Sequence, residues 1–295
     1  MTKPIDVLAL AKQLVRCPSI TPTVPEHTPA CHDTLMILAN MAAAAGATFH
    51  ILGFEGGHEK WGYPVTNLFV HWKKGNPKRH LCFLGHTDVV PVGDAAAWTY
   101  PPFGGNVANG YLYGRGATDM KGAVAAFFAA ACNSISGLDD VEVSAIITTD
   151  EEWGAINGTT KVLGWMKEQG FAPDAFLVGE PSSADVLATH VKIGRRGSLT
   201  GKLIATGIQG HVAYPGAFVN PHRALSLALA ILHAQQWHDA TAIFPATQFE
   251  GVVVEGGSDK ASNVVPAQAT ATWNVRYTPA FSTPALADVL TQALA

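Results

Sequence analysis

The sequence has few cysteines, no large excess of positive or negative charge and no long apolar run, and each of these absences argues against a class of protein. The four cysteines are scattered with no C-x-x-C pair, which argues against a thiolate zinc site and a disulfide framework. The longest strongly apolar run, at 123–132, is too short to span a bilayer. The chain has 19 basic and 23 acidic residues, a net charge of -4, and no run of lysine or arginine. We therefore expect neither nucleic acid nor a membrane as a partner.

The N-terminus does not have the shape of a secretion signal. Apolar residues recur there at the spacing of one helix face, at Val7, Leu10, Ala11 and Leu14. Asp6 interrupts any apolar stretch that a signal peptide would need. We therefore expect an amphipathic helix at this end and a cytoplasmic protein.

The pattern of strands and helices changes near residue 195. Before it, apolar strand-like runs alternate with helical stretches, and the strand-like runs lie at 67–72, 81–85, 141–149 and 174–179. After it, strands at 198–207, 249–257 and 269–279 surround a helix at 221–237. The alternation before residue 195 predicts an α/β fold with helices on a mixed sheet. The pattern after it predicts a smaller α+β domain. A length of 295 residues also favours two domains, which we place at 1–194 and 195–295.

One apolar strand ends in a histidine and an aspartate. Residues i and i+2 of a strand point to one face, so His86 and Asp88 in "LCFLGHTDVVP" should lie side by side. In the simpler interpretation Asp88 caps the turn before Pro91 and His86 is an ordinary half-buried histidine. In the other, His86 is a metal ligand and Asp88 fixes its tautomer.

A glycine-rich segment, "LYGRGATDMKG" at 112–122, places a carboxylate where a dinucleotide loop would have glycine. Asp119 would repel a pyrophosphate, so a nucleotide site is a poor interpretation. A loop that holds this carboxylate over a site is a better one, although Asp119 could simply cap the following helix.

Three more carboxylates follow apolar strands. Glu151 and Glu152 end the strand before Trp153, and Glu180 ends the next one. Alone, these could be helix-terminal or turn residues. Together with His86 and Asp119 they are expected at the carboxyl ends of strands, where α/β sheets bind ligands. One imidazole with several carboxylates suits zinc or a similar divalent metal, and a bridging carboxylate suits a pair of metals.

These motifs carry a family resemblance. "GHTDVVP", "GRGATDMKG", "TTDEEWGAINGT" and "GEPSS", in this order and spacing, resemble the M20 family of dizinc metallopeptidases and deacylases. The stretches at 192–215 and 263–279 support the resemblance, which runs along essentially the whole chain. It implies a zinc-peptidase-like catalytic domain with an inserted dimerisation or lid domain, two Zn²⁺ ions with Co²⁺ possible in one position, and a homodimer.

The resemblance also implies roles for individual residues. His86, Glu152 and Glu180 resemble metal ligands, and Asp119 resembles the carboxylate that bridges the metals. Glu151 is similar to the general base, and Asp88 to the residue that orients His86. In the second domain His211 resembles an oxyanion-stabilising histidine that reaches the other subunit's site. The residues that resemble contacts to the substrate's carboxylates are Arg195, Ser198, Tyr214, Asn263 and Arg276, although Arg195 and Arg196 could also be solvated strand charges.

The activity that the resemblance implies is hydrolysis of the amide in N-succinyl-LL-2,6-diaminopimelate, which yields succinate and LL-2,6-diaminopimelate for lysine and cell-wall synthesis. One alternative is another deacylase of the family, such as one acting on acetylornithine. A second is a non-catalytic protein that dimerises and binds metal. The stretch "IGRRGS" favours the succinyl substrate, since a dianionic acyl group suits guanidinium groups.

The C-terminus departs from the family pattern. Relatives return from the small domain to the catalytic domain and supply a final histidine ligand there. This chain stops at "LADVLTQALA", in what the sequence predicts to be a helix of the small domain. We therefore expect the return segment to be absent, one metal position to be weakly occupied, and this chain alone to turn over little or no substrate.

Overall fold

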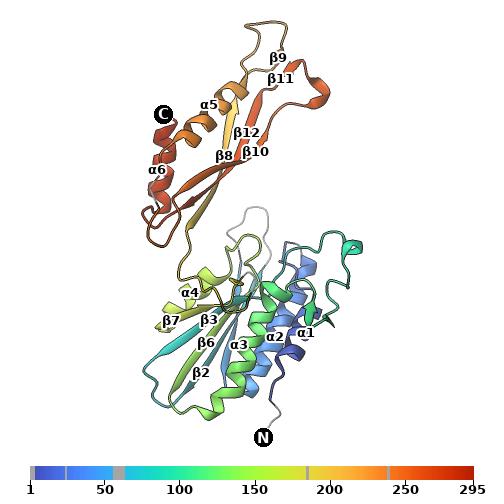
Figure 1. Cartoon of the computed structure of the whole chain (residues 1–295), viewed down its shortest axis with the longest axis vertical. Coiled ribbons are helices and arrows are strands. Elements are labelled where there is room, and N and C mark those ends of the chain that lie inside the picture. Colours follow the sequence, from blue (N-terminus) through green and yellow to red (C-terminus); the bar gives the residue numbers. More distant parts are fainter. Residues whose placement is uncertain (1–3, 24, 56–63, 184–185, 238–239) are drawn as a thin grey trace. The chain divides into compact units, whose positions relative to one another are not determined.

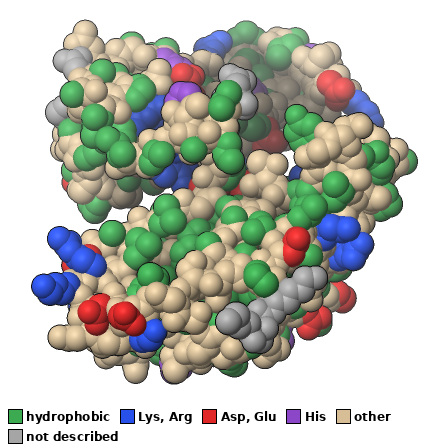
Figure 2. Space-filling model, turned by 60° about the horizontal axis from the view of Figure 1, so that its bottom comes forward, with side chains coloured by type: hydrophobic (Ala, Val, Ile, Leu, Met, Phe, Trp, Pro, Cys, Tyr) green, Lys and Arg blue, Asp and Glu red, His purple; other side chains and the backbone are tan. Residues whose placement is uncertain are grey.

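The computed structural model describes residues 4–23, 25–55, 64–183, 186–237 and 240–295. They form two compact units, Met1–Ala188 and Thr189–Ala295, and the division lies close to the expected boundary at residue 195 (Figure 1). None of the described helices combines the length and apolar character that a bilayer crossing needs. On the face seen in Figure 2, basic and acidic side chains are interspersed and do not form a patch of one sign.

Unit 1 is built around a five-stranded mixed sheet in the order β1-β2-β6-β3-β7. Its strands are β1 (Thr48–Phe54), β2 (Val65–Lys74), β3 (His80–His86), β6 (Val141–Thr148) and β7 (Ala175–Val178). β2 pairs antiparallel with β1 and β6, whereas β3 runs parallel to both β6 and β7. The carboxyl ends of β6, β3 and β7 therefore meet at one edge of the sheet.

Helices cover both faces of this sheet (Figure 1). The α-helices among the described residues of the unit are α1 (Val7–Arg16), α2 (Thr28–Ala44), α3 (Gly122–Ser134) and α4 (Thr159–Glu168). The first three pack on one face through a core that includes Leu14, Leu38 and Phe128. α4 packs on the other face, where Val162 and Met166 contact a smaller core. A short hairpin, β4 (Asn106–Ala108) and β5 (Tyr111–Tyr113), lies outside the sheet.

The periodicity at the N-terminus predicts the helix correctly but not its whole buried face. α1 begins at Val7 after Asp6, whose side chain caps it by accepting the N–H of Ala9. Leu10, Ala11 and Leu14 are buried as expected. Val7 lies on the same face but in the first turn, and 45% of it is exposed.

Unit 2 is a three-stranded antiparallel sheet with two helices on one face (Figure 1). The sheet has the order β10-β12-β8, from β8 (Gly197–Thr206), β10 (Gln248–Glu255) and β12 (Gln268–Tyr277). The helices are α5 (Pro221–Ala234) and α6 (Thr283–Ala293), and a small ribbon pairs β9 (Gly210–His211) with β11 (Val264–Val265). Along β8 every second residue is less exposed, the mark of a sheet covered on one side. The expected mixed α/β fold is confirmed.

Candidate metal centre

His86 is the last residue of β3 and its side chain is buried. The ring is held from one side, since Nδ1 donates to the backbone carbonyl of Asp88 at 3.0 Å. That bond leaves Nε2 pointing toward two carboxylates, with Asp119 Oδ1 at 3.0 Å and Glu180 Oε1 at 3.5 Å. A histidine fixed through one nitrogen, with carboxylate oxygens gathered at the other, has the arrangement of a metal ligand.

Three different segments bring this cluster together. His86 ends β3, Glu180 follows β7, and Asp119 lies in the turn of residues 117–121 before α3. One ligand atom from each lies within 4.8 Å of the others. The turn begins at Gly116, whose φ of 79° is one that residues with a side chain rarely adopt. The glycine-rich segment thus holds the carboxylate of Asp119 at the sheet edge.

Asp88 has a different position from the one that strand geometry predicts. β3 ends at His86, so Asp88 lies beyond the strand, and its carboxylate is 3.5 Å from His86 Nδ1. The hydrogen bond to the ring comes from the Asp88 carbonyl instead. The buried carboxylate mainly accepts the Thr21 hydroxyl at 2.8 Å and the backbone N–H groups of Glu151 and Glu152, each at 3.1 Å. Asp88 therefore fixes the loop after β6 to the end of β3.

Glu151 and Glu152 lie near the cluster without joining it. Within the part of the chain that the structure describes, the group of ligand atoms around His86 does not include Glu152, although we expected its carboxylate to converge there. Burial raises the pKa of both carboxyls, and the neighbouring carboxylate of Asp119 raises them further, against a lowering by His86. Glu152 thus stays a predicted ligand and Glu151 a predicted base.

The donor set fits a divalent cation. Burial lowers the pKa of His86, but the carboxylates of Asp88 and Glu180 outweigh that effect and raise it to about 11. In the metal-free protein a proton on the imidazole therefore offsets the charge of these carboxylates. One imidazole nitrogen and two carboxylate oxygens are ligands that zinc accepts.

Lys121 is a buried residue beside this site that the motifs of the sequence did not single out. Its ammonium group donates to the Cys17 carbonyl at 2.8 Å, and the side chain is fully buried. Burial lowers its pKa to about 8, although the nearby Cys17, Cys31 and Asp88 act in the opposite direction. Its position two residues after Asp119 was the one available signal.

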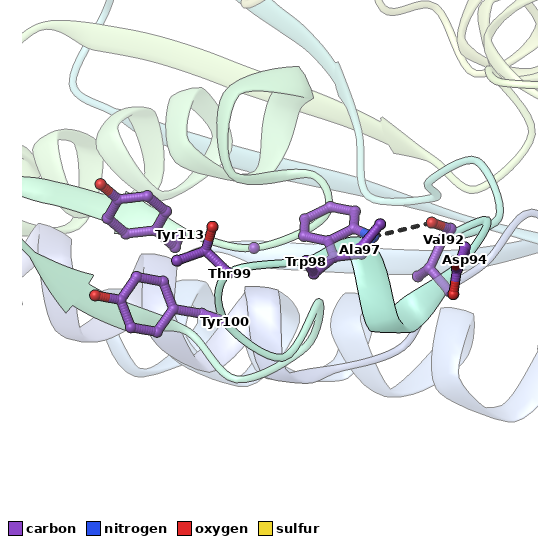
Figure 3. Close-up of a pocket in the computed structure, with 8 residues that line it drawn as sticks. Val92, Asp94, Ala97, Trp98, Thr99, Tyr100 and Tyr113 are labelled. Carbon is purple, nitrogen blue, oxygen red and sulfur yellow. Dashed lines mark hydrogen bonds between the residues drawn. The ribbon is translucent and has the colours of Figure 1, made fainter.

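A separate cavity of about 420 Å³ lies in the segment between β3 and α3 (Figure 3). Trp98, Tyr100 and Tyr113 line it, and the indole N–H of Trp98 donates to the Val92 carbonyl at 3.0 Å. None of the clustered ligands lines this cavity, so we assign it no part in the metal centre.

Three of the predicted residues of unit 2 come together around the β9–β11 ribbon. His211 lies 3.1 Å from the side-chain amide of Asn263, and its ring centroid is 5.6 Å from that of Tyr214. The Ala213 N–H donates to His211 Nδ1 at 3.1 Å, so the neutral ring carries its proton on Nε2. The Asn263 amide must then accept through its oxygen, with amide nitrogen and oxygen exchanged.

The other predicted contacts lie at the start of β8, in the three-stranded sheet rather than in the ribbon. Ser198 on β8 pairs with Arg276 on β12, and Arg195 is exposed just before β8. β8 spans eight steps, or about 26 Å, from Ser198 to its last residue, Thr206, and β9 begins only at Gly210. The predicted residues of unit 2 thus lie in two groups, and their contacts to substrate stay a prediction.

The chain matches the family model "Peptidase family M20/M25/M40" over residues 82–295. A succinyl-diaminopimelate desuccinylase of Rhodopseudomonas palustris is 41% identical over 298 residues, which cover 100% of this chain and 74% of that protein. One from Rhodospirillum centenum is 45% identical over 275 residues, covering 92% of this chain and 68% of that protein.

Two solved structures share the fold. An M20 family metallo-carboxypeptidase from Sulfolobus solfataricus aligns with a TM-score of 0.73 at 17% identity, over 98% of this chain and 75% of that one. A dinuclear metal-binding peptidase of the M20 family from Bacillus subtilis aligns with a TM-score of 0.59 at 15% identity, over 98% and 68%. The resemblance seen in the sequence motifs is thereby confirmed: the chain belongs to peptidase family M20/M25/M40 and is a hydrolase that acts on an amide bond.

Proposed function

We propose that this protein hydrolyses the amide of N-succinyl-LL-2,6-diaminopimelate to succinate and LL-2,6-diaminopimelate, a step of lysine and diaminopimelate synthesis. The observation that carries the proposal is the convergence of His86, Asp119 and Glu180 at the carboxyl edge of the sheet. The substrate is proposed because relatives that are 41% and 45% identical bear the name succinyl-diaminopimelate desuccinylase.

His86, Asp119, Glu152 and Glu180 would hold two Zn²⁺ ions in this proposal. Zinc in such a site supplies Lewis acidity, which polarises a carbonyl and lowers the pKa of water. The chain's own residues handle the proton. Glu151 lies beside the cluster in a partly buried position that raises its pKa, which suits a group that takes a proton from water and returns it to the leaving amine.

His211 is proposed to turn its Nε2–H from the Asn263 amide to the oxyanion that forms at the amide carbon when substrate is bound. The hydrogen bond from the Ala213 N–H supports this assignment, because it selects the tautomer with the donor on Nε2. Arg195, Ser198 and Arg276 are proposed to bind substrate carboxylates, as are Tyr214 and Asn263.

We also propose a homodimer in which unit 2 pairs with its copy. The length of β8 that separates the two groups of unit 2 residues is about 26 Å, too long for one small substrate to contact both groups of a single subunit. In a dimer, one site can contain both groups if each group comes from a different subunit. The edge of β10 supports such pairing, since it exposes Val252 and Val254.

An assay with paired substrates tests the function. The protein translated from the complete reading frame is loaded with zinc and given N-succinyl-LL-2,6-diaminopimelate or N-acetylornithine, and the released amine is measured. We expect the kcat/KM for the succinyl substrate to be at least about a hundredfold higher than that for N-acetylornithine. The acetyl group lacks the carboxylate of the succinyl group, so it leaves the polar groups that bind this carboxylate unpaired. Preference for acetylornithine would establish the other deacylase, and metal binding without hydrolysis of either would contradict the proposal.

A further inference from the structure

A second cluster of metal-ligating side chains lies at the opposite end of the sheet from His86. It consists of His71 on β2, His80 at the start of β3 and Glu142 at the start of β6. His80 and His86 are six steps apart on one strand, which separates the two clusters by about 20 Å. The strands alone position this second cluster, since it includes no loop residue.

The sheet register directs the three side chains to one face. His80 is the parallel partner of Glu142, and His71 is the antiparallel partner of Ser144, two residues after Glu142. Paired residues share a face, as do residues two apart on a strand. This is the face covered by α4, because Cys82 and Ile146 follow in the same alternation and pack there.

We propose that His71, His80 and Glu142 form a second metal site, which takes a divalent transition metal such as Zn²⁺. Glu142 Oε1 lies 3.0 Å from His71 Nε2 and 4.0 Å from His80 Nδ1. Two imidazole nitrogens and one carboxylate oxygen are a zinc donor set. Ligand atoms on a tetrahedral zinc stand about 3.3 Å apart, so small side-chain movements bring all three onto one ion.

The surroundings orient each ligand. His80 Nε2 lies 2.8 Å from the Ser144 hydroxyl, so the ring is held through the nitrogen that faces away from Glu142. Lys73 binds the other carboxylate oxygen of Glu142 at 3.1 Å and leaves Oε1 to the histidines. Phe171 packs edge-on against His71, with ring centroids 5.0 Å apart.

A simple ion pair between His71 and Glu142 does not account for the whole cluster. His80 Nδ1 lies 4.0 Å from Glu142 Oε1, which is beyond hydrogen-bond distance but close enough for one ion to contact both atoms. The side chains are 14% exposed for His71, 7% for His80 and 16% for Glu142. Solvent can therefore reach the cluster, and a water molecule can complete the coordination of an ion bound there.

The test uses untagged full chain in which Asp119→Ala and Glu180→Ala remove the first cluster. Zinc per chain is measured by equilibrium dialysis and elemental analysis, and the Tm is measured with and without zinc. We expect about one zinc ion per chain and a higher Tm with the metal, since a ligand of the folded state stabilises it. Adding either His71→Gln or His80→Gln should remove both effects. Adding His50→Gln, an exposed histidine of β1 in the same sheet, should change neither.

Circular dichroism in chelator first establishes that each variant folds. His71→Gln and His80→Gln are read independently, and Glu142→Gln replaces either one that does not fold. Retention of zinc by the folded histidine variants, or no zinc in the background protein, would overturn the site and leave an ion pair. This result is independent of the proposed hydrolysis, because the measurement is made without the first cluster and without substrate.

Discussion

The carboxylate of Asp88 accepts the backbone N–H of Glu151 at 3.1 Å, although 63 residues separate the two in sequence. The same oxygen accepts the N–H of Glu152. Asp88 follows β3 and Glu151 follows β6, two parallel neighbours in the sheet. One buried acceptor thus determines where the loop with both glutamates stands relative to His86.

Asp88→Asn should destabilise the folded chain by about 1–3 kcal/mol, because an amide that replaces the carboxylate loses part of its capacity to accept from N–H groups. The free energy of unfolding is measured by urea denaturation. Asp33→Asn, an exposed aspartate of α2 in the same unit, should change it by less than about 0.5 kcal/mol. Equal effects of the two substitutions would show that the buried hydrogen bonds to Asp88 contribute no stability.

Glu151→Gln should lower kcat by roughly 10²–10⁴-fold while the zinc content stays unchanged, since the amide keeps the shape but cannot take a proton. The measurement is the hydrolysis assay on the zinc-loaded product of the complete reading frame, with elemental analysis of the same samples. Glu168→Gln, an exposed residue at the end of α4, is the matched control and should leave both values unchanged. Loss of zinc together with activity would instead make Glu151 a ligand.

Metal binding at the His86 cluster should release a proton. The carboxylates of Asp88 and Glu180 overcome the effect of burial and raise the pKa of His86 to about 11, so the metal-free ring is protonated at neutral pH. A metal must displace that proton, and its affinity should therefore rise about tenfold per pH unit below this pKa. Calorimetry in buffers of different ionisation enthalpy measures the release, with about one proton per ion from His86 expected. A heat that does not depend on the buffer would contradict the assigned protonation state.

The sequence predicted the sheet of unit 1 and its functional edge better than the details of the site. Apolar runs identify β3 and β6 because both faces of these strands are buried, and polar residues just after such runs mark the carboxyl ends. The position of Asp88 could not be predicted in the same way. It depends on where β3 ends and on Thr21 and the loop after β6, which come together only in the folded chain.

The cluster of His71, His80 and Glu142 shows a second limit. Its residues come from three strands, and they are close only because the strands have the order β2-β6-β3. This order cannot be predicted from the sequence of each strand alone. Each residue also has an ordinary interpretation as a polar residue near a strand end. The sequence therefore contained the ligands without a signal that joined them.

The edge of β10 provides the last prediction. β10 pairs with β12 on one side, and among the described residues no strand covers its other side. This edge exposes 63% of Val252 and 57% of Val254, and α5, which contacts β10, exposes 63% of Leu227. A long apolar edge strand pairs readily with another strand unless a charge blocks it.

Val254→Lys should therefore convert the proposed dimer to monomer, because a charged side chain on the paired edge cannot be desolvated without loss of binding free energy. Sedimentation velocity at several protein concentrations measures the change. Ile204→Lys is the matched control, since Ile204 is 61% exposed but lies on β8, the opposite edge strand of the same sheet. If Ile204→Lys dissociates the dimer and Val254→Lys does not, the interface lies on the β8 side. If the unmodified chain is a monomer, the proposed dimer is wrong.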